Sequence, residues 1–267
     1  MRRKYIQALK YLFYRFVLRR QFLLGKDDKY GLQFKFKIED VVGRRIFKNG
    51  GYERDISEYI AENIAFTNND VALDIGANIG WYSLLLNKLM PKSGKIFAFE
   101  PEPLNFSLLS ENISINRASN VYAINKALSN KKEFKTLYLY SNRNLGRHSL
   151  LDVNENSEIK VETIQLDDFL QEKNIDFDRV KFAKIDIEGY EFFALTGATK
   201  ALDYIKCLVC EFVPDRMRQG GVDPRDLISL LEGKGFCPNI HKAGQLCSVT
   251  SAELLNGSAC DIVWLKQ

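Results

Sequence analysis

Three acids stand where predicted strands end, and they are the residues of this sequence best suited to binding and chemistry. Asp74 closes the apolar run VALD, Glu100 closes IFAFE, and Asp186 closes FAKID. In an open sheet of parallel strands, ligands bind beyond the carboxyl ends of the strands. Because each acid directly follows a run that must be buried, we expect the three carboxylates to line a binding cleft.

The stretch DIGANIG, residues 74–80, combines the first acid with a tight turn. Gly76 and Gly80 allow close approach of a ligand, and the helix expected after Gly80 points free N–H groups at the loop. A dinucleotide-binding loop carries glycine where Asp74 stands, because a carboxylate there would repel the pyrophosphate. Asp74 instead suits a ligand with a cationic amino group beside its own carboxylate, which is the arrangement of an amino acid.

Glu100 indicates the second part of this ligand, a ribose. It lies 26 residues after Asp74, close to the spacing at which an acid binds the vicinal hydroxyls of a ribose. Its two oxygens are acceptors only, so they suit both hydroxyls. Pro101 and Pro103 stiffen the following turn and could present a flat apolar wall to an adenine. An amino-acid end, a ribose and an adenine together indicate S-adenosylmethionine.

The segment FAKIDIEGYE is the expected reaction centre. Strand alternation places Lys184, Asp186 and Glu188 on one side. We expect Asp186 to organise the cofactor and Glu188 to face the acceptor as a general base. The alternative for Glu188 is a cap on the helix that follows Gly189. His148 is a rival base, because its unperturbed pKa is near 6.5, or else a plain surface residue.

A divalent metal is the other chemistry to consider. Asp186 and Glu188 could supply two hard oxygen ligands, and Glu211, which ends the next predicted strand, either lines the cleft or is a solvated strand end. Because no firm third ligand is evident and such sites need a full oxygen shell, we expect no metal.

The elements that must position these residues form an alternating pattern, which predicts a parallel sheet with both faces covered. The patterns predict helices at 53–64, 81–89, 103–115, 190–202 and 223–234, and strands at 71–75, 95–100, 120–125, 180–186, 206–212, 236–240 and 260–266. Two strongly alternating segments, 134–140 and 159–166, flank a polar loop and predict a β-hairpin excursion. Two short strands are expected within 30–48. We divide the chain into an N-terminal extension, 1–50, and a main domain, 51–267.

The N-terminal extension is basic and amphipathic. Residues 1–26 carry eight basic residues and no acid, which leaves a net charge of −4 on the remainder of a chain whose total is +4. Its apolar residues form one helix face: Tyr5, Ile6, Leu9, Leu12, Phe13, Phe16 and Val17. Charges interrupt the segment too often for a transmembrane span or signal sequence. Residues 1–24 either rest on anionic lipid or pack on their own domain or on a twin subunit in a homodimer.

The composition excludes other classes of partner. The mildly acidic main domain argues against nucleic-acid binding. The five cysteines form an odd set with no secretory segment before them, which predicts reduced thiols in the cytoplasm, with peripheral contact at the inner face of the membrane left open. Cys207 and Cys210 belong to a buried strand, where a spacing of three sends the side chains to opposite faces.

The sequence resembles the FkbM family of S-adenosylmethionine-dependent O-methyltransferases over about residues 50–215. The matching motifs are DIGANIGWYS, FAFEPEPLNFSLLSENISIN, ALSN, VETIQLDDFL and KIDIEGYEFFALTGATKAL. The resemblance implies the class I, Rossmann-like methyltransferase fold, an α/β fold with a seven-stranded, mostly parallel sheet and an antiparallel last strand. It also implies a cofactor site at Asp74, Gly76, Asn78, Gly80 and Glu100, with Pro101 beside it and Asp186 at the methionine end.

The expected function is therefore transfer of a methyl group from S-adenosylmethionine to a hydroxyl of a glycan, a lipid-linked sugar or a secondary metabolite. A non-catalytic nucleotide-binding module and an NAD-binding oxidoreductase of related architecture are the alternatives. The acceptor itself is not specified, because specificity in such folds lies in loops and appended segments.

Overall fold

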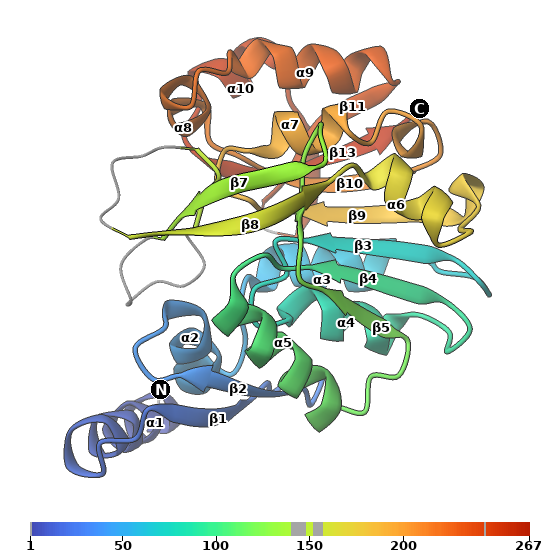
Figure 1. Cartoon of the computed structure of the whole chain (residues 1–267). Helices are drawn as coiled ribbons and strands as arrows, with labels where there is room; N and C mark the ends of the chain where they lie inside the picture. Colours follow the sequence, from blue (N-terminus) through green and yellow to red (C-terminus); the bar gives the residue numbers. More distant parts are fainter. Residues whose placement is uncertain (1, 140–147, 152–156, 243) are drawn as a thin grey trace.

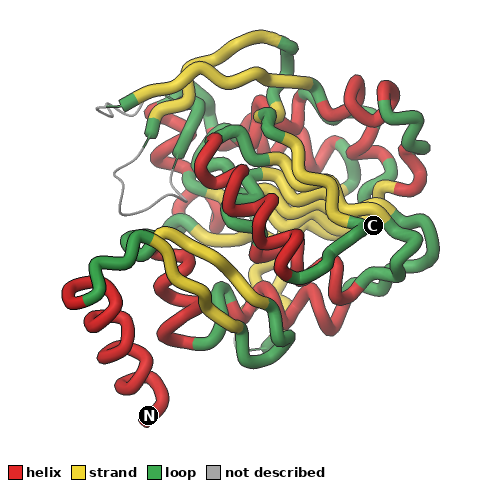
Figure 2. Tube along the Cα trace, turned by 60° about the horizontal axis from the view of Figure 1, so that its bottom comes forward, coloured by secondary structure: helices red, strands yellow, loops and turns green. Residues whose placement is uncertain are grey.

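A single eight-stranded sheet runs through the middle of the computed structural model, with helices on both faces (Figures 1 and 2). The structure describes residues 2–139, 148–151, 157–242 and 244–267. The strand order is β12-β11-β13-β10-β9-β3-β4-β5. In chain order these strands are β3 (Val71–Ile75), β4 (Lys95–Phe99), β5 (Val121–Ile124), β9 (Val180–Ile185), β10 (Cys207–Phe212), β11 (Phe236–Lys242), β12 (Gln245–Ser248) and β13 (Cys260–Lys266).

The strand directions confirm the expected sheet. β5, β4, β3, β9 and β10 are parallel neighbours, whereas β13, the last strand of the chain, is antiparallel to both β10 and β11. The eighth strand, β12, pairs antiparallel with β11 at the edge. β12 could not be predicted from the sequence, because all four of its residues are exposed and there is no buried face to produce an alternating pattern.

The helices form two layers that each cover one face of the sheet. On one face lie α3 (Arg54–Asn63), α4 (Trp81–Leu89) and α5 (Pro103–Ile115), while α2 (Val41–Asn49) extends this layer over the N-terminal hairpin; on the other face lie α6 (Leu166–Glu172), α7 (Glu191–Thr196), α9 (Pro224–Gly233) and α10 (Ser251–Asn256). Alternate residues along each strand belong to the two hydrophobic cores, one on each face of the sheet. Cys207 belongs to the first core and Cys210 to the second, which confirms that these cysteines point to opposite faces.

Two predicted elements need correction. The predicted helix 190–202 stops at Thr196, and a short 3-10 turn at Ala201–Asp203 follows. Of the two strands expected within 30–48, one is confirmed as β2 (Gln33–Lys37) and the other is wrong, because the strand that pairs with β2 is β1 (Phe22–Lys26), which lies earlier. The residues after the hairpin form α2, whose first turn is capped where the Asp40 carboxylate accepts a hydrogen bond from Gly43 N at 2.8 Å. Helices α6, α8 (Pro214–Gln219) and α10 were not predicted.

The β-hairpin excursion is confirmed as a separate small sheet. β7 (Glu133–Tyr138) pairs antiparallel with β8 (Glu158–Ile164), and β6 (Ala127–Leu128) adds a parallel partner. Most of the polar loop between β7 and β8 lies outside the described residues, with His148 and its neighbours the exception.

Hydrogen bonds from α5 attach the N-terminal hairpin to the main domain. The side chain of Asn112, which is buried, accepts from Lys35 N at 2.6 Å and donates to Lys35 O at 3.1 Å and Ile79 O at 2.9 Å. Asn116 repeats the pattern on Gln33, with bonds of 2.9 and 2.6 Å. Two amide side chains thus take the place of a neighbouring strand along the free edge of β2.

The N-terminal helix α1 (Arg2–Leu12) continues into a turn of π-helix (Phe13–Val17) and projects from the body of the molecule (Figure 2). In the described part of the chain, no helix has the length and apolar character needed to cross a bilayer.

Replacing Asn112 by alanine should destabilise the protein by about 2–3 kcal/mol, because three backbone groups lose their partner where water has little access. Asn116→Ala is the matched control. It removes the same kind of bond at a half-buried site and should cost less than about 1 kcal/mol, since water can replace the amide. Urea unfolding measures both variants, and equal losses would contradict the role given to burial.

Candidate active site

Two adjoining cavities lie at the carboxyl ends of the parallel strands. The smaller has a volume of about 540 Å³ and is lined by Glu100, Pro101 and His148, among others. The larger has a volume of about 1150 Å³ and is lined by Asp74 and Glu188, among others. Gly76, Asn78 and Asp186 line both. The structure therefore brings the sequence-predicted site residues to one place, with the turn 74–80 and Asp186 between two compartments. Gly80 does not line either cavity but ends this turn.

Gly76 cannot be replaced without moving the backbone. Its φ of +82° is left-handed, and a Cβ would meet the backbone oxygen of Asp186 at 1.9 Å. The N–H groups of Gly76 and Ala77 both donate to Phe99 O at 3.0 Å. The turn after β3 is thus fastened to both neighbouring strands, and Gly76 is needed because β9 passes directly against it.

Glu100 is held by two backbone donors. Asn78 N donates to its Oε2 at 2.8 Å, and Glu102 N donates to its Oε1 at 2.9 Å. Burial raises the pKa of Glu100 to about 8, even though both hydrogen bonds favour the charged form. Each oxygen keeps a lone pair that can accept a hydrogen bond from a ligand. The Oδ1 of Asn78 is also buried and has no partner among the described residues.

Asp74 is buried in the wall of the larger cavity. Ser83 Oγ, one turn into α4, donates to its Oδ2 at 2.5 Å. Burial raises the pKa of Asp74 to about 6, against the opposing effects of Ser83 and of the Lys184 ammonium. The carboxyl group is therefore mainly ionised at neutral pH, and the site can stabilise a cationic group.

Lys184 is a fully buried cation between two acids. Its Nζ lies 3.0 Å from Asp261 Oδ1 and 3.5 Å from Asp186 Oδ2. Burial alone would lower the pKa of Lys184, but Asp261, Asp186 and further carboxylates raise it well above its usual range. The buried ammonium holds Asp186 in position, as expected from strand alternation, and Asp261 on β13 is a partner that the sequence did not indicate.

The turn after Asp186 is capped by Glu191 and not by Glu188. The Oε1 of Glu191 accepts hydrogen bonds from Ile187 N and Gly189 N, both at 3.1 Å, whereas the Glu188 carboxylate forms an ion pair with Arg216. The helix-capping alternative for Glu188 is therefore wrong. The φ of Glu188 is +57°, a left-handed value that is costly for a residue other than glycine. The tertiary structure holds this residue in place and turns its side chain into the larger cavity.

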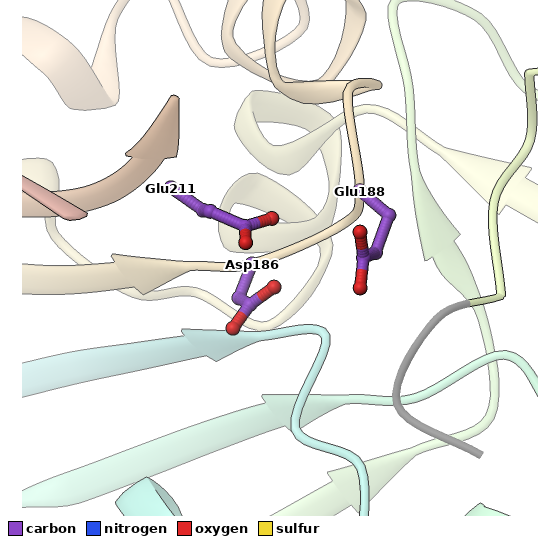
Figure 3. A group of neighbouring side chains, drawn as sticks. All are labelled: Asp186, Glu188 and Glu211. Atoms are coloured by element: carbon purple, nitrogen blue, oxygen red, sulfur yellow. The ribbon is translucent and has the colours of Figure 1, made fainter. Parts of the chain in front are cut away.

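Glu211 completes an acidic group with Asp186 and Glu188. Each of the three residues offers a carboxylate oxygen, and these oxygens lie within 4.8 Å of one another (Figure 3). Sequence reasoning left open whether Glu211 was a solvated strand end, and the structure places it in the cavity wall. The sequence feature that could have placed Glu211 in the site is its position at the end of β10, the strand next to β9.

The two histidines lie in different surroundings. His148 lines the smaller cavity, where burial lowers its pKa to about 4, so it is neutral and weakly basic at pH 7. His241 belongs to β11, away from both cavities, and its ring lies 5.4 Å from that of Tyr59. His148 shares its compartment with Glu100 and Asp186 but not with Glu188.

Part of the wall of the larger cavity is formed by residues that were not predicted from the sequence. Val41, Val42 and Arg45 of α2, with Tyr52 and Glu53, form one wall. Tyr82 donates to Glu53 Oε2 at 2.6 Å, and burial raises the pKa of Glu53. No motif could indicate these residues, because only packing of the N-terminal segment brings them to the site.

Glu191→Gln should change how the free energy of unfolding varies with pH. Burial raises the pKa of Glu191 to about 7 from a usual value of 4.5, so the folded state binds more protons than the unfolded state between these values. Stability from this group is present at low pH and is lost as the pH rises towards 7. Glutamine can keep the two accepted bonds without the charge. As the pH rises from about 5 to 7, the free energy of unfolding of Glu191→Gln should therefore increase relative to that of the wild type by about 1–2 kcal/mol.

The measurement is urea unfolding at several pH values. Glu172→Gln, which changes an exposed carboxylate on α6, is the matched control and should follow the wild type throughout. A Glu191→Gln curve parallel to that of the wild type would show that Glu191 does not titrate in this range.

Comparison with known proteins identifies the family. The methyltransferase FkbM domain matches residues 74–237. The hexuronic acid methyltransferase AglP of Haloferax volcanii is 28% identical over 193 residues, which cover 71% of this chain and 72% of that protein. The methyltransferase sdnD of Sordaria araneosa is 28% identical over 214 residues, covering 69% of this chain and 80% of that protein.

Solved structures of methyltransferases are also similar. The methyltransferase FkbM from Methylobacillus flagellatus has 14% identity and a TM-score of 0.49, and the match covers 90% of this chain but only 56% of that chain. The O-methyltransferase TM0748 from Thermotoga maritima has 14% identity and a TM-score of 0.46, covering 90% and 76% of the two chains. Because the matched FkbM domain spans more than half of the sequence and includes the turn 74–80, Glu100, Asp186 and Glu211, the chain is an enzyme of the FkbM family of S-adenosylmethionine-dependent methyltransferases.

Proposed function

We propose that this enzyme methylates a hydroxyl oxygen of a glycan, a lipid-linked sugar or a secondary metabolite. The main observation in support is the acidic group of Asp186, Glu188 and Glu211, which lines the larger cavity beside the turn 74–80. Carboxylates suit the uptake of a hydroxyl proton. The name of one relative supports a sugar acceptor, since that protein is a hexuronic acid methyltransferase.

The cofactor residues proposed are Asp74, Gly76, Asn78, Glu100 and Asp186. Glu100 fits a ribose, because its oxygens are fixed by backbone donors and each can accept one more bond. The orphaned Oδ1 of Asn78 is a further acceptor in the wall that the two cavities share. Asp74 and Asp186 supply negative charge for the amino group and the sulfonium.

Pro101 and Gly80 complete the cofactor proposal in supporting roles. Pro101 lines the smaller cavity, where its ring can form part of an apolar wall for the adenine. Gly80 ends the turn with a φ of +92°, which lets α4 begin directly after it.

S-adenosylmethionine supplies a methyl group on a positively charged sulfur, which leaves as a neutral thioether. The residues of this chain then need only to align the acceptor oxygen and take up its proton. In our proposal Asp186 orders the cofactor and Glu188 faces the acceptor hydroxyl. His148 is the weaker candidate for the proton, because its pKa is low and it lies in the other compartment.

Variants of Glu100 and Glu188 should separate cofactor binding from methyl transfer. Glu100→Gln puts an NH2 group against one of two backbone donors, so the affinity for S-adenosylhomocysteine should fall about 10- to 100-fold in calorimetry. Glu188→Gln should leave that affinity unchanged and reduce methyl transfer about 100- to 10,000-fold. Transfer is measured as the mass increment of one methyl group on an extracted glycan or metabolite pool.

Glu111→Gln, an exposed carboxylate on α5, is the control for both measurements and should match the wild type. Full turnover in Glu188→Gln would remove that residue from the reaction. Binding of NAD in place of S-adenosylhomocysteine would contradict the proposed cofactor site.

We further propose that residues 1–24 rest on an anionic membrane surface. The helix does pack on its own domain, but through Tyr11, which is buried and donates to Ile38 O at 2.5 Å. The apolar stripe read from the sequence faces solvent instead, with exposed fractions of 68% for Leu9 and 65% for Phe16. An exposed apolar stripe on a segment with eight basic residues and no acid within residues 1–26 matches anionic lipid in both polarity and charge.

Phe16→Glu should reduce flotation with vesicles that contain phosphatidylglycerol by about tenfold or more, because an apolar contact is lost and a repelled charge is added. Phe134→Glu is the matched control. It makes the same change at an equally exposed position, 73% exposed, on β7, and should float like the wild type. Equal flotation of the two variants, or a dimer that only Phe16→Glu dissociates, would overturn the membrane proposal.

A further inference from the structure

The acidic group of Asp186, Glu188 and Glu211 has the donor set of a cation site. Its oxygens lie within 4.8 Å of one another and come from the end of β9, the turn that follows it, and the end of β10 (Figure 3). β9 and β10 are neighbouring parallel strands, so their carboxyl ends lie at the same edge of the sheet. Carboxylate oxygens are the ligands that Mg²⁺, Mn²⁺ and Ca²⁺ prefer.

Among the described residues, Glu211 differs from its two neighbours because it forms no salt bridge. Asp186 contacts Lys184 and Glu188 contacts Arg216. The Oε2 of Glu211 is buried, and among the described residues it has no hydrogen-bond partner. A buried carboxylate oxygen that has no hydrogen-bond partner among the described residues and is directed into the group is an independent sign of a ligand site.

The charged residues that line the larger cavity also favour a bound cation. Five acids line it, Glu53, Asp74, Asp186, Glu188 and Glu211, against three bases, Arg45, Lys184 and Arg216. Lys184 is also shared with Asp261, which lies closer to it than Asp186 does. Acids therefore outnumber bases in the wall of this cavity, and buried negative charge is costly unless it is paired.

We propose that Asp186, Glu188 and Glu211 bind one divalent cation of the hard, oxygen-preferring class. From the sequence we expected no metal, because only two ligands, Asp186 and Glu188, were evident. The structure adds Glu211 as the third. Neighbouring ligands of a cation that binds oxygen at about 2.0–2.6 Å lie about 3–3.7 Å apart, so side-chain rotation has to bring the carboxylate oxygens closer together when the cation binds. Three carboxylates leave coordination positions free for water and for an acceptor oxygen.

This inference rests on the proposed function for its purpose, though not for its geometry. A cation bound beside Asp186 lies in the compartment that we assign to the acceptor, and a hydroxyl bound to a divalent cation has a lowered pKa. Glu188 would then act on the acceptor through the cation that it helps to hold. The acceptor oxygen would be oriented by the same three residues that make it a better nucleophile.

The test is titration of the full-length, metal-free protein with Mn²⁺ alone, with free Mn²⁺ measured by electron paramagnetic resonance. We expect one Mn²⁺ bound per chain and at least tenfold weaker binding in Glu211→Gln. Glu232→Gln, an exposed carboxylate on α9, is the matched control and should bind like the wild type. Circular dichroism shows whether Glu211→Gln is folded, and Glu188→Gln is a second variant in which binding should weaken.

No Mn²⁺ binding by the wild type at millimolar concentrations would overturn the cation site, as would unchanged binding in folded Glu211→Gln and Glu188→Gln. Calorimetry with S-adenosylhomocysteine, without metal, distinguishes this failure from failure of the proposed function. Cofactor binding without Mn²⁺ binding would remove the cation site alone. Mn²⁺ binding without cofactor binding would leave the cation site standing and contradict the function.

Discussion

Burial of negative charge at the carboxyl edge of the sheet is the constraint on which the rest of this structure depends. Asp74, Glu100, Glu188 and Glu191 are all buried there, and an unpaired buried carboxylate is strongly disfavoured. The fold meets this cost in separate ways. Backbone N–H groups stabilise Glu100 and Glu191, a hydroxyl stabilises Asp74, and Arg216 pairs with Glu188. Lys184, itself buried, is stable because Asp186 and Asp261 surround it.

These arrangements leave the larger cavity with more acids than bases, which fits the chemistry of the family. The methyl donor is a cation at its sulfur and carries a second positive charge on its amino group. A positively charged ligand favours the ionised form of buried carboxyl groups, so the donor and the site stabilise each other. In our proposals the donor and one divalent cation together supply the charge that Glu211 and its neighbours lack.

Much of the fold could be predicted, because the parallel strands are buried on both faces and alternate with amphipathic helices. The antiparallel last strand and the β-hairpin excursion were also predicted. The errors fall where that signal is absent. β12 is exposed on both faces, and the second strand expected within 30–48 is replaced by α2, whose first turn is capped by Asp40.

For the site, the sequence by itself determined which acids stand at strand ends, and hence Asp74, Glu100 and Asp186 as candidate site residues, because chain order and strand period fix those positions. Only the tertiary structure decided the partners. Asp261 reaches Lys184, Arg216 reaches Glu188, Asn112 secures the N-terminal hairpin, and Glu211 closes the acidic group. These contacts join segments far apart in the chain, and a pattern of neighbouring residues carries no record of which distant segments will meet.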